Sequence, residues 1–350
     1  MHNKVVSKNI RKIRFPLIVL IVMIHSYFEV RGTSYGISIF RYIQIFLSQI
    51  LSRIAVPLFF MISAYLLFLR YELSFGFYFS LLKKKIKSLL IPFLIWNVVV
   101  FFFFFFLQKI PFAAKYSSGN LKGFSELTFL ETIELVFLRP IANQFWFIRD
   151  LMILIIVSPL IKVFLDKGKV FTVFIVFVVM LYFSESNTIQ YFNFESLCFF
   201  VIGAYLSKYK STNFSVDKTL LISLSVIFLT VSIFEAYVYF NTLKYVYWLH
   251  YLNICFGVWV FWNYFLLLNE RLSNKMFSLE KYTFITYAMH IPLNLIVYRI
   301  IISLFPLNFL SLFGAYMATF TLSILVSILF GRFLNKFSPS FYAIITGNRQ

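Results

Sequence analysis

Long apolar runs follow one another along this 350-residue chain, and short, mostly basic segments separate them. An α-helix needs about 20 mostly apolar residues to cross the hydrocarbon core of a bilayer. The pattern therefore predicts an all-α fold, a polytopic integral membrane bundle of about ten transmembrane helices. Residues 1–335 would form the transmembrane domain and residues 336–350 a short cytoplasmic tail. The predicted spans lie near residues 13–30, 43–69, 88–107, 143–161, 170–184, 191–207, 219–240, 246–268, 282–302 and 309–331.

The composition supports this prediction. Hydrophobic residues make up 61% of the chain and charged residues 13%, whereas a soluble domain has about 45–50% apolar and about 25% charged residues. A water-soluble fold of this size would have too few polar side chains to cover its surface. Water is therefore excluded as the main solvent of the protein, and the lipid bilayer is expected to surround it.

The net charge of +19 would also suit a nucleic-acid partner, so the position of the cations decides its meaning. With a cytoplasmic N-terminus, 22 of the 32 Lys and Arg residues fall in the inner segments and seven in the outer ones. Cytoplasmic segments of membrane proteins hold such an excess of cations. The charge thus predicts that both termini are cytoplasmic and that nucleic acid is not a partner.

Three cations fall within predicted spans: Arg53, Arg149 and Arg299. A charge at the bilayer centre costs at least about 2.5–3.5 kcal/mol and usually faces a cavity or a partner. Arg299 lies near a helix end and can extend to the interface. Arg53 and Arg149 lie deeper. We favour functional roles for both, with one alternative for Arg149, namely neutralisation by Asp150 or Glu195.

His25 lies in the first predicted span, eleven residues after Arg14. On a helix this separation is about three turns, so both side chains project from one face, about 16 Å apart along the axis. Taken singly, each has an ordinary explanation: a hydrogen-bonded packing group for His25 and a cytoplasmic anchor for Arg14. Together they place a cation at the inner mouth in line with an imidazole near mid-membrane.

Further polar residues are predicted at a similar depth. Asn97 lies roughly 13 Å into the third span and His290 roughly 12 Å into the ninth, by the rise of a helix. With His25, Arg53 and Arg149 they would form a polar reaction chamber. His250 and Glu235 lie nearer the outer surface and are weaker candidates.

The sequence contains no phosphate-binding glycine loop, no dinucleotide fingerprint and no spacing of zinc ligands. Its two cysteines, Cys198 and Cys255, both lie inside apolar runs, so neither a disulfide framework nor a metal pair is indicated. We expect no metal.

Several segments resemble the integral-membrane acyltransferase 3 family, which includes many bacterial glycan O-acetyltransferases. The resemblance runs in order over about residues 10–300. Ala64 stands where glycine is common in the family, which is a mild departure. The segments are Arg14-Phe15-Pro16 to His25-Ser26, Arg53 to Leu67, the basic run Lys83 to Lys87 with Leu90 to Asn97, Phe145-Trp146-Phe147-Ile148-Arg149-Asp150-Leu151 with Ser158-Pro159-Leu160, Phe199 to Leu206, and Tyr287 to Pro292.

The resemblance implies transfer of an acyl group, usually acetyl, from cytoplasmic acetyl-CoA or another acyl-CoA to a hydroxyl of a cell-surface or lipid-linked glycan. Glycan-assembly proteins would be further partners. His25 would act as general base or as acyl relay, because an imidazole in hydrogen-bond reach can accept the hydroxyl proton. Arg14, with Lys84 and Lys85 of the basic run, would bind the CoA phosphates.

The same resemblance supplies candidates for the chamber. Arg149, Arg53 or Asn97 would stabilise the oxyanion, and we favour Arg149. Trp146, Asp150 and His290 would complete the walls.

Two other functions fit the same residues. A glycan or lipid transporter or flippase could use the intramembrane polar groups as a translocation path. An inactive homologue could act as a scaffold. Acyl-CoA dependence separates the enzyme from both.

Overall fold

The computed structural model describes residues 2–30, 34–109, 127–184, 188–189, 191–209, 217–242, 246–266 and 278–348. Within these residues the regular structure is helical except for one short antiparallel pair, β1 (Thr188–Ile189) and β2 (Phe192–Asn193). Thr188 lies opposite Asn193 and Ile189 opposite Phe192. The predicted all-α class is confirmed.

The α-helices follow one another as α1 (His2–Ile24), α2 (Tyr35–Gln44), α3 (Ala55–Phe68), α4 (Phe75–Lys85), α5 (Ile91–Lys109), α7 (Phe129–Phe137), α8 (Trp146–Ile156), α9 (Ser158–Asp166), α10 (Gly168–Phe183), α11 (Phe194–Tyr209), α12 (Lys218–Thr242), α13 (Tyr247–Leu266), α15 (Thr283–Leu304), α16 (Phe309–Phe337) and α17 (Pro339–Thr346). The π- and 3₁₀-helical turns are η1 (Ile45–Ile50), η2 (Leu51–Ile54), η3 (Ile86–Leu90), η5 (Asn143–Phe145) and η6 (Glu280–Tyr282).

Five helices of the described chain are long and apolar enough to cross a membrane. They are Tyr35–Phe68, Phe75–Phe106, Lys218–Thr242, Glu280–Leu304 and Phe309–Phe337. Ile13–Ile24 and Gly168–Phe183 are shorter apolar helices. The chain is therefore a membrane protein, while the count of ten spans and the cytoplasmic termini stay predictions.

Some predicted spans differ from the helices that form. The spans expected at 43–69 and 88–107 are parts of longer helices that begin at Tyr35 and Phe75. The span expected at 143–161 divides into α8 and α9 around Val157, which has φ −83° and ψ 0°. Pro159 lies in the first turn of α9, where its missing N–H costs no helical hydrogen bond.

The helix from Tyr35 to Phe68 is irregular in its middle. A π-helical turn, η1, is followed directly by the 3₁₀ turn η2 before α3 continues. Such changes of helical repeat are frequent at functional sites, because they redirect side chains without ending the helix. Arg53 lies in η2 and Gln49 in η1.

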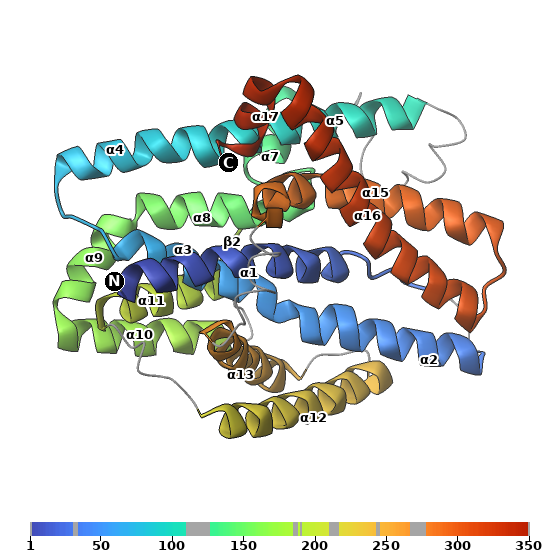
Figure 1. Cartoon of the computed structure of the whole chain (residues 1–350), viewed down its shortest axis with the longest axis horizontal. Helices are drawn as coiled ribbons and strands as arrows, with labels where there is room; N and C mark the ends of the chain where they lie inside the picture. Colours follow the sequence, from blue (N-terminus) through green and yellow to red (C-terminus); the bar gives the residue numbers. More distant parts are fainter. Residues whose placement is uncertain are drawn as a thin grey trace.

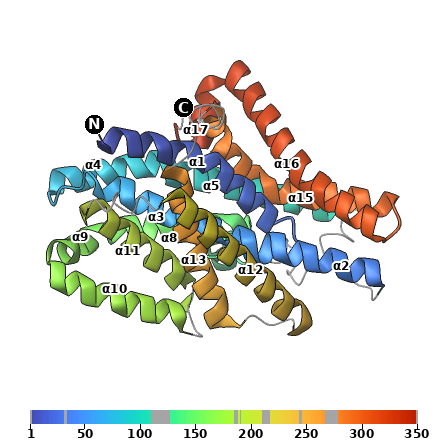
Figure 2. The ribbon, with the colours of Figure 1, turned by 60° about the horizontal axis from the view of Figure 1, so that its bottom comes forward.

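The N-terminal helix α1 lies at the centre of the bundle and contacts α3, α13, α15 and α16 (Figure 1). Helix α12 lies at the lower edge of the molecule in Figure 1 and comes to the front in the turned view (Figure 2). The tightest pairing joins α11 to α3, where a Cβ added to Gly203 would lie 2.1 Å from the carbonyl oxygen of Met61. These contacts fix the elements that carry the candidate site.

The described part of the predicted tail, residues 336–348, is largely folded. Helix α16 continues to Phe337, and α17 packs against α5 and α16 (Figure 1). Tyr342 and Ile345 of α17 are buried, and the indole Nε1 of Trp96 donates to the Ile345 carbonyl at 3.0 Å. Burial of this short apolar face is a tertiary effect that charge counting along the sequence does not reveal.

Candidate active site

A basic cavity of about 890 Å³ opens between α1, α3, α4, α8 and α15. Glu280 is the single acid among its described lining residues. An excess of cations around a concave, partly apolar space favours an anionic ligand with an apolar part. The cations that line the cavity are Arg14, Arg70, Lys84, Lys85 and Lys281.

The structure thus brings together Arg14, Lys84 and Lys85, as the sequence predicted. Arg14 Nη1 donates to Glu280 Oε1 at 3.0 Å. Ile18 and Ile21 line the same cavity, and they follow Arg14 by four and seven residues on one face of α1. His25 continues this series beyond the lining residues, so one helix face leads from the cations to the imidazole.

His25 lies immediately after the end of α1 at Ile24. Its ring faces the ring of His290 from α15, with 5.1 Å between centroids and 48° between planes. His290 is fully buried, and its Nδ1 lies 2.7 Å from the carbonyl oxygen of Tyr287. Tyr287 lines the basic cavity, so the histidine pair lies directly behind the cavity wall.

A polar contact holds the two helices together beside the histidine pair. Asn294 Nδ2 donates to Ser26 Oγ at 3.2 Å, and Ser26 Oγ donates to the Val22 carbonyl at 2.8 Å. Ser26 and Asn294 are both buried. This contact fixes the end of α1, and with it His25, against α15.

Arg53 belongs to the same region. Its Nη2 donates to Gln49 Oε1, and its Nε is buried without a hydrogen-bond partner among the described residues. The guanidinium charge interacts electrostatically with His25 and with Glu195. The irregular turns η1 and η2 therefore carry a cation whose charge acts on His25.

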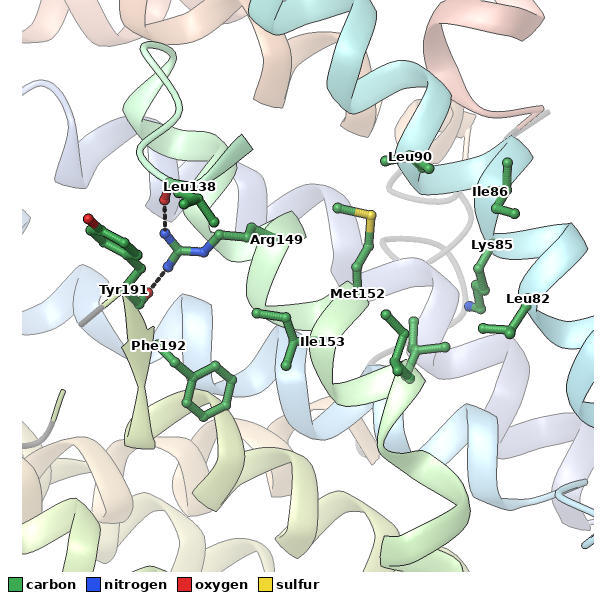
Figure 3. Close-up of a pocket in the computed structure, with 12 residues that line it drawn as sticks. Leu82, Lys85, Ile86, Leu90, Leu138, Arg149, Met152, Ile153, Tyr191 and Phe192 are labelled. Atoms are coloured by element: carbon green, nitrogen blue, oxygen red, sulfur yellow. Dashed lines mark hydrogen bonds between the residues drawn. The ribbon is translucent and has the colours of Figure 1, made fainter. Parts of the chain in front are cut away.

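Arg149 is held elsewhere, by the backbone carbonyls of Leu138 and Tyr191 (Figure 3) and by the carboxylate of Asp150. Its Nε and Nη2 donate to Asp150 Oδ1 at 3.0 and 2.7 Å. Nη1 donates to the Leu138 carbonyl at 2.5 Å, and Nη2 also donates to the Tyr191 carbonyl. Asp150, fully buried, accepts from Ser196 Oγ at 2.9 Å through Oδ2. This ion pair matches the alternative explanation of Arg149, in which Asp150 neutralises its charge.

The groove beside Arg149 is separate from the basic cavity. It has a volume of about 470 Å³, is mostly apolar, and runs along α8 from Arg149 past Met152 to Lys85 (Figure 3). Lys85 lines both spaces. The structure does not bring Arg149 to the described walls of the basic cavity.

Two further predicted residues lie outside the described cavity lining. Asn97 is buried, and its Nδ2 donates to the Phe93 carbonyl of its own helix at 2.8 Å. Trp146 packs beside Phe60, with 6.3 Å between ring centroids. These contacts stabilise helix packing and give neither residue a place at the histidine pair.

The weaker candidates form a cluster of their own. His250 Nδ1 lies 2.5 Å from Glu235 Oε1, and Asn253 Nδ2 donates to Glu235 Oε2 at 2.7 Å. The pair joins α12 to α13 and satisfies a buried carboxylate. In the described part of the chain, no group of three or more His, Cys, Asp or Glu side chains is arranged to hold a metal ion.

Sequence reasoning missed several residues that the structure places at the site. Gln49 lies four residues before Arg53, and Asn294 lies four residues after His290, so helical spacing was a usable signal for both. Glu280 was overlooked because only cations were counted in the basic segments. Gly347 and Asn348, which line the basic cavity, were assigned to the tail.

Comparison with known proteins identifies the family of the chain. The sequence model described as an acyltransferase domain matches residues 9–332. The chain belongs to this acyltransferase family. The match covers nearly the whole chain and confirms the resemblance inferred from the motifs.

One relative is the succinoglycan biosynthesis protein ExoH of Rhizobium meliloti (strain 1021), which is 29% identical over 164 residues. The aligned part makes up 46% of this chain and 44% of the relative. The chain thus spans less than half the length of that protein. No solved structure matches the chain.

Proposed function

We propose that this protein is a membrane O-acyltransferase that moves an acetyl or other acyl group from cytoplasmic acyl-CoA to a hydroxyl of a cell-surface or lipid-linked glycan. Family membership supports the acyl transfer, and the name of the relative, a succinoglycan biosynthesis protein, supports a glycan acceptor. The main structural support for this function is the basic cavity, which leads along one face of α1 to the histidine pair.

The basic cavity suits the donor. CoA carries several phosphate charges on an elongated molecule, and Arg14, Lys84 and Lys85 supply matching cations. Arginine offers a fixed fork of donors to phosphate, whereas lysine acts as a mobile point charge. Apolar residues farther along the cavity, such as Ile18 and Ile21, would contact the less polar arm that carries the thioester.

In the proposed reaction, the sugar oxygen attacks the thioester carbonyl carbon while His25 accepts the hydroxyl proton. The new C–O bond forms, the C–S bond breaks, and the proton passes from His25 to the departing CoA thiolate. Arg53 is our choice for the oxyanion partner, because it is the cation that interacts with His25. Arg149 is less suited, since Asp150 and two backbone carbonyls already accept hydrogen bonds from all three of its guanidinium nitrogens.

The proposed topology follows from the charge pattern. With ten spans and both termini in the cytoplasm, the basic cavity opens towards the compartment that supplies acetyl-CoA. An acceptor glycan would approach the histidine pair from the opposite side or along the membrane. The bacterial cytoplasmic membrane is the expected location.

The experiment is transfer of radiolabelled acetate from acetyl-CoA by the purified protein in lipid nanodiscs. The acceptor probe is the total membrane and envelope glycan fraction of the source bacterium. We expect labelled glycan from the wild-type protein and none from His25→Ala, while acetyl-CoA still stabilises the variant against heat, since a ligand stabilises the state it binds. Full transfer by His25→Ala would overturn the role of His25.

Two additional outcomes are informative. Movement of unlabelled glycan across proteoliposomes without acetyl-CoA would favour the transporter alternative instead. Label that stays on the protein when no acceptor is present, and disappears in His25→Ala, would identify an acyl-histidine relay. Absence of protein-bound label together with labelled glycan would identify direct transfer.

A further inference from the structure

The hydrogen bond at His290 Nδ1 determines where this imidazole carries its hydrogen. The partner is the Tyr287 carbonyl oxygen at 2.7 Å, which can only accept, so Nδ1 must be the donor. A neutral imidazole has one N–H, and its second nitrogen is then an acceptor. A fully buried ring favours the neutral form because burial penalises charge. His290 Nε2 is therefore an acceptor.

This acceptor has no hydrogen-bond partner within the described chain, although it is buried. Buried polar atoms are normally paired, and an exception calls for a functional explanation. The ring of His25 lies beside the ring of His290, with 5.1 Å between the ring centroids. At this separation a small rotation of either ring brings one nitrogen of each within hydrogen-bond distance.

We propose that His290 is a positioning residue for His25. His290 Nε2 accepts the N–H of the His25 ring, which leaves the other nitrogen of His25 unprotonated and directed at the acceptor hydroxyl. The role resembles that of the aspartate in a Ser-His-Asp triad, which orients the catalytic imidazole and fixes its tautomer. Here the orienting group is neutral. The inference rests on the proposed function, in which His25 is the base.

In this arrangement each polar hydrogen between the sugar and Tyr287 points to a defined acceptor. The sugar O–H points to His25, the His25 N–H points to His290 Nε2, and the His290 N–H points to the Tyr287 carbonyl. When His25 accepts the sugar proton it becomes an imidazolium with two N–H groups, and His290 continues to accept one of them. The other proton then returns to the CoA thiolate, so His290 neither gains nor loses a proton.

The surroundings hold this arrangement in place. Tyr287 is anchored at its own hydroxyl, which donates to the Gln144 carbonyl at 2.5 Å, and Gln144 Nε2 donates to the Ala288 carbonyl at 3.0 Å. On the other side, Asn294 binds Ser26, the residue after His25. Helix α15 therefore fixes both the orienting imidazole and the chain segment that carries the base.

The test compares His290→Gln with His290→Phe. Glutamine offers an amide oxygen near the position of Nε2 and can still accept from His25, whereas phenylalanine fills the volume without an acceptor. We expect the Phe variant to lower kcat about 100-fold or more, the range for a lost general base, with KM for acetyl-CoA unchanged. The Gln variant should recover most of kcat. Equal kcat for Phe and wild type would overturn the proposal.

A second measurement does not depend on activity. The chain has four histidines, so ¹⁵N spectra of imidazole-labelled protein can be assigned by single substitutions. We expect His290 in the Nδ1–H tautomer and a hydrogen-bonded N–H on His25 that is lost in His290→Phe. An unchanged His25 signal in that variant would contradict the proposal, even if His290→Phe folds poorly enough to lose activity for another reason.

The matched control is His250→Gln. His250 lies on α13 and pairs with Glu235 of α12, away from the described lining of the basic cavity. This variant should keep kcat and the His25 spectrum. Failure of the proposed function is distinguishable, because the wild-type protein would then transfer no acyl group while the spectra still report the His25–His290 contact. If the wild type is active and His25-dependent but His290→Phe is normal, only the positioning role fails.

Discussion

Arg14 of α1 forms an ion pair with Glu280 at the edge of the basic cavity, with 3.0 Å between Nη1 and Oε1. The arginine side chain is 33% exposed and the glutamate side chain 11%. A carboxylate in this place repels the phosphates of the proposed donor while it orients the guanidinium that would bind them. The pair therefore gives opposite predictions for its two members.

Arg14→Gln should raise KM for acetyl-CoA about tenfold or more, because a hydrogen bond to a charged group is lost. Glu280→Gln should lower KM by a factor of about two to five, since it removes the like charge yet keeps an oxygen that Arg14 can bind. Initial rates against acetyl-CoA concentration measure both. Lys169→Gln on α10, outside the described cavity lining, controls for net charge. A higher KM for Glu280→Gln would show that orienting Arg14 outweighs the repulsion.

The second prediction concerns Gly347, which has φ +70° and ends α17 at the cavity lip. An added Cβ would lie 2.3 Å from the Ser88 carbonyl oxygen. Gly347→Ala should cost about 1–2 kcal/mol for the left-handed conformation alone, and it should raise KM for acetyl-CoA by displacing the lip. Thermal unfolding and KM measure the two effects. Gly314→Ala in α16, whose Cβ would meet nothing within 4 Å, should leave KM unchanged and should not lower stability, because alanine favours the helix. A normal KM for acetyl-CoA in Gly347→Ala would show that the end of α17 does not belong to the donor site.

The parts of the site that the sequence predicted best depend on regular helix. Helix α1 keeps its repeat from Arg14 as far as Ile24, directly before His25, and the alignment predicted from residue spacing depends on this regularity. Lys84 and Lys85 were predicted from a basic run near a helix end, which is also a feature of neighbouring residues in the sequence. The helical class followed from apolar run length for the same reason.

Other parts depend on geometry that a regular repeat does not contain. Gln49 and Arg53 lie in the π and 3₁₀ turns between Ile45 and Ile54, and the sequence did not indicate these turns. The sequence did not indicate that the Leu138 and Tyr191 carbonyls also accept from Arg149, because Leu138 precedes it by 11 residues and Tyr191 follows it by 42. Hydrogen bonds between separate segments of this kind form only in the folded chain.

The third prediction separates stability from chemistry at Arg149. Arg149→Gln leaves the fully buried Asp150 without its counter-charge, and breaking a buried pair in this way costs about 3–5 kcal/mol. The double variant Arg149→Gln/Asp150→Asn removes both charges and should be more stable than the single one. Thermal unfolding in detergent measures both. We expect the double variant to keep kcat per folded molecule; a loss of kcat of about 100-fold or more, the cost of removing an oxyanion donor, would restore Arg149 as the oxyanion partner.

The last prediction concerns Arg53, whose charge interacts with His25. If Arg53 stabilises the oxyanion, Arg53→Gln should lower kcat on the order of 100- to 1000-fold, the usual cost of one lost donor at such a site. KM for acetyl-CoA should change little, because the charge develops only in the transition state. Arg53→Lys keeps the charge but loses the planar fork that reaches Gln49 Oε1, so it should recover only part of kcat.

Gln49→Leu tests the same geometry from the other side, since it removes the group that accepts from Arg53 Nη2. We expect a smaller fall in kcat than for Arg53→Gln, because the cation remains but is less well oriented. Single-turnover rates with saturating acetyl-CoA isolate the chemical step from donor binding. Arg53→Gln with a normal single-turnover rate would exclude the oxyanion role. A rise in KM alone would instead assign Arg53 to donor binding, where its charge would act before the chemistry begins.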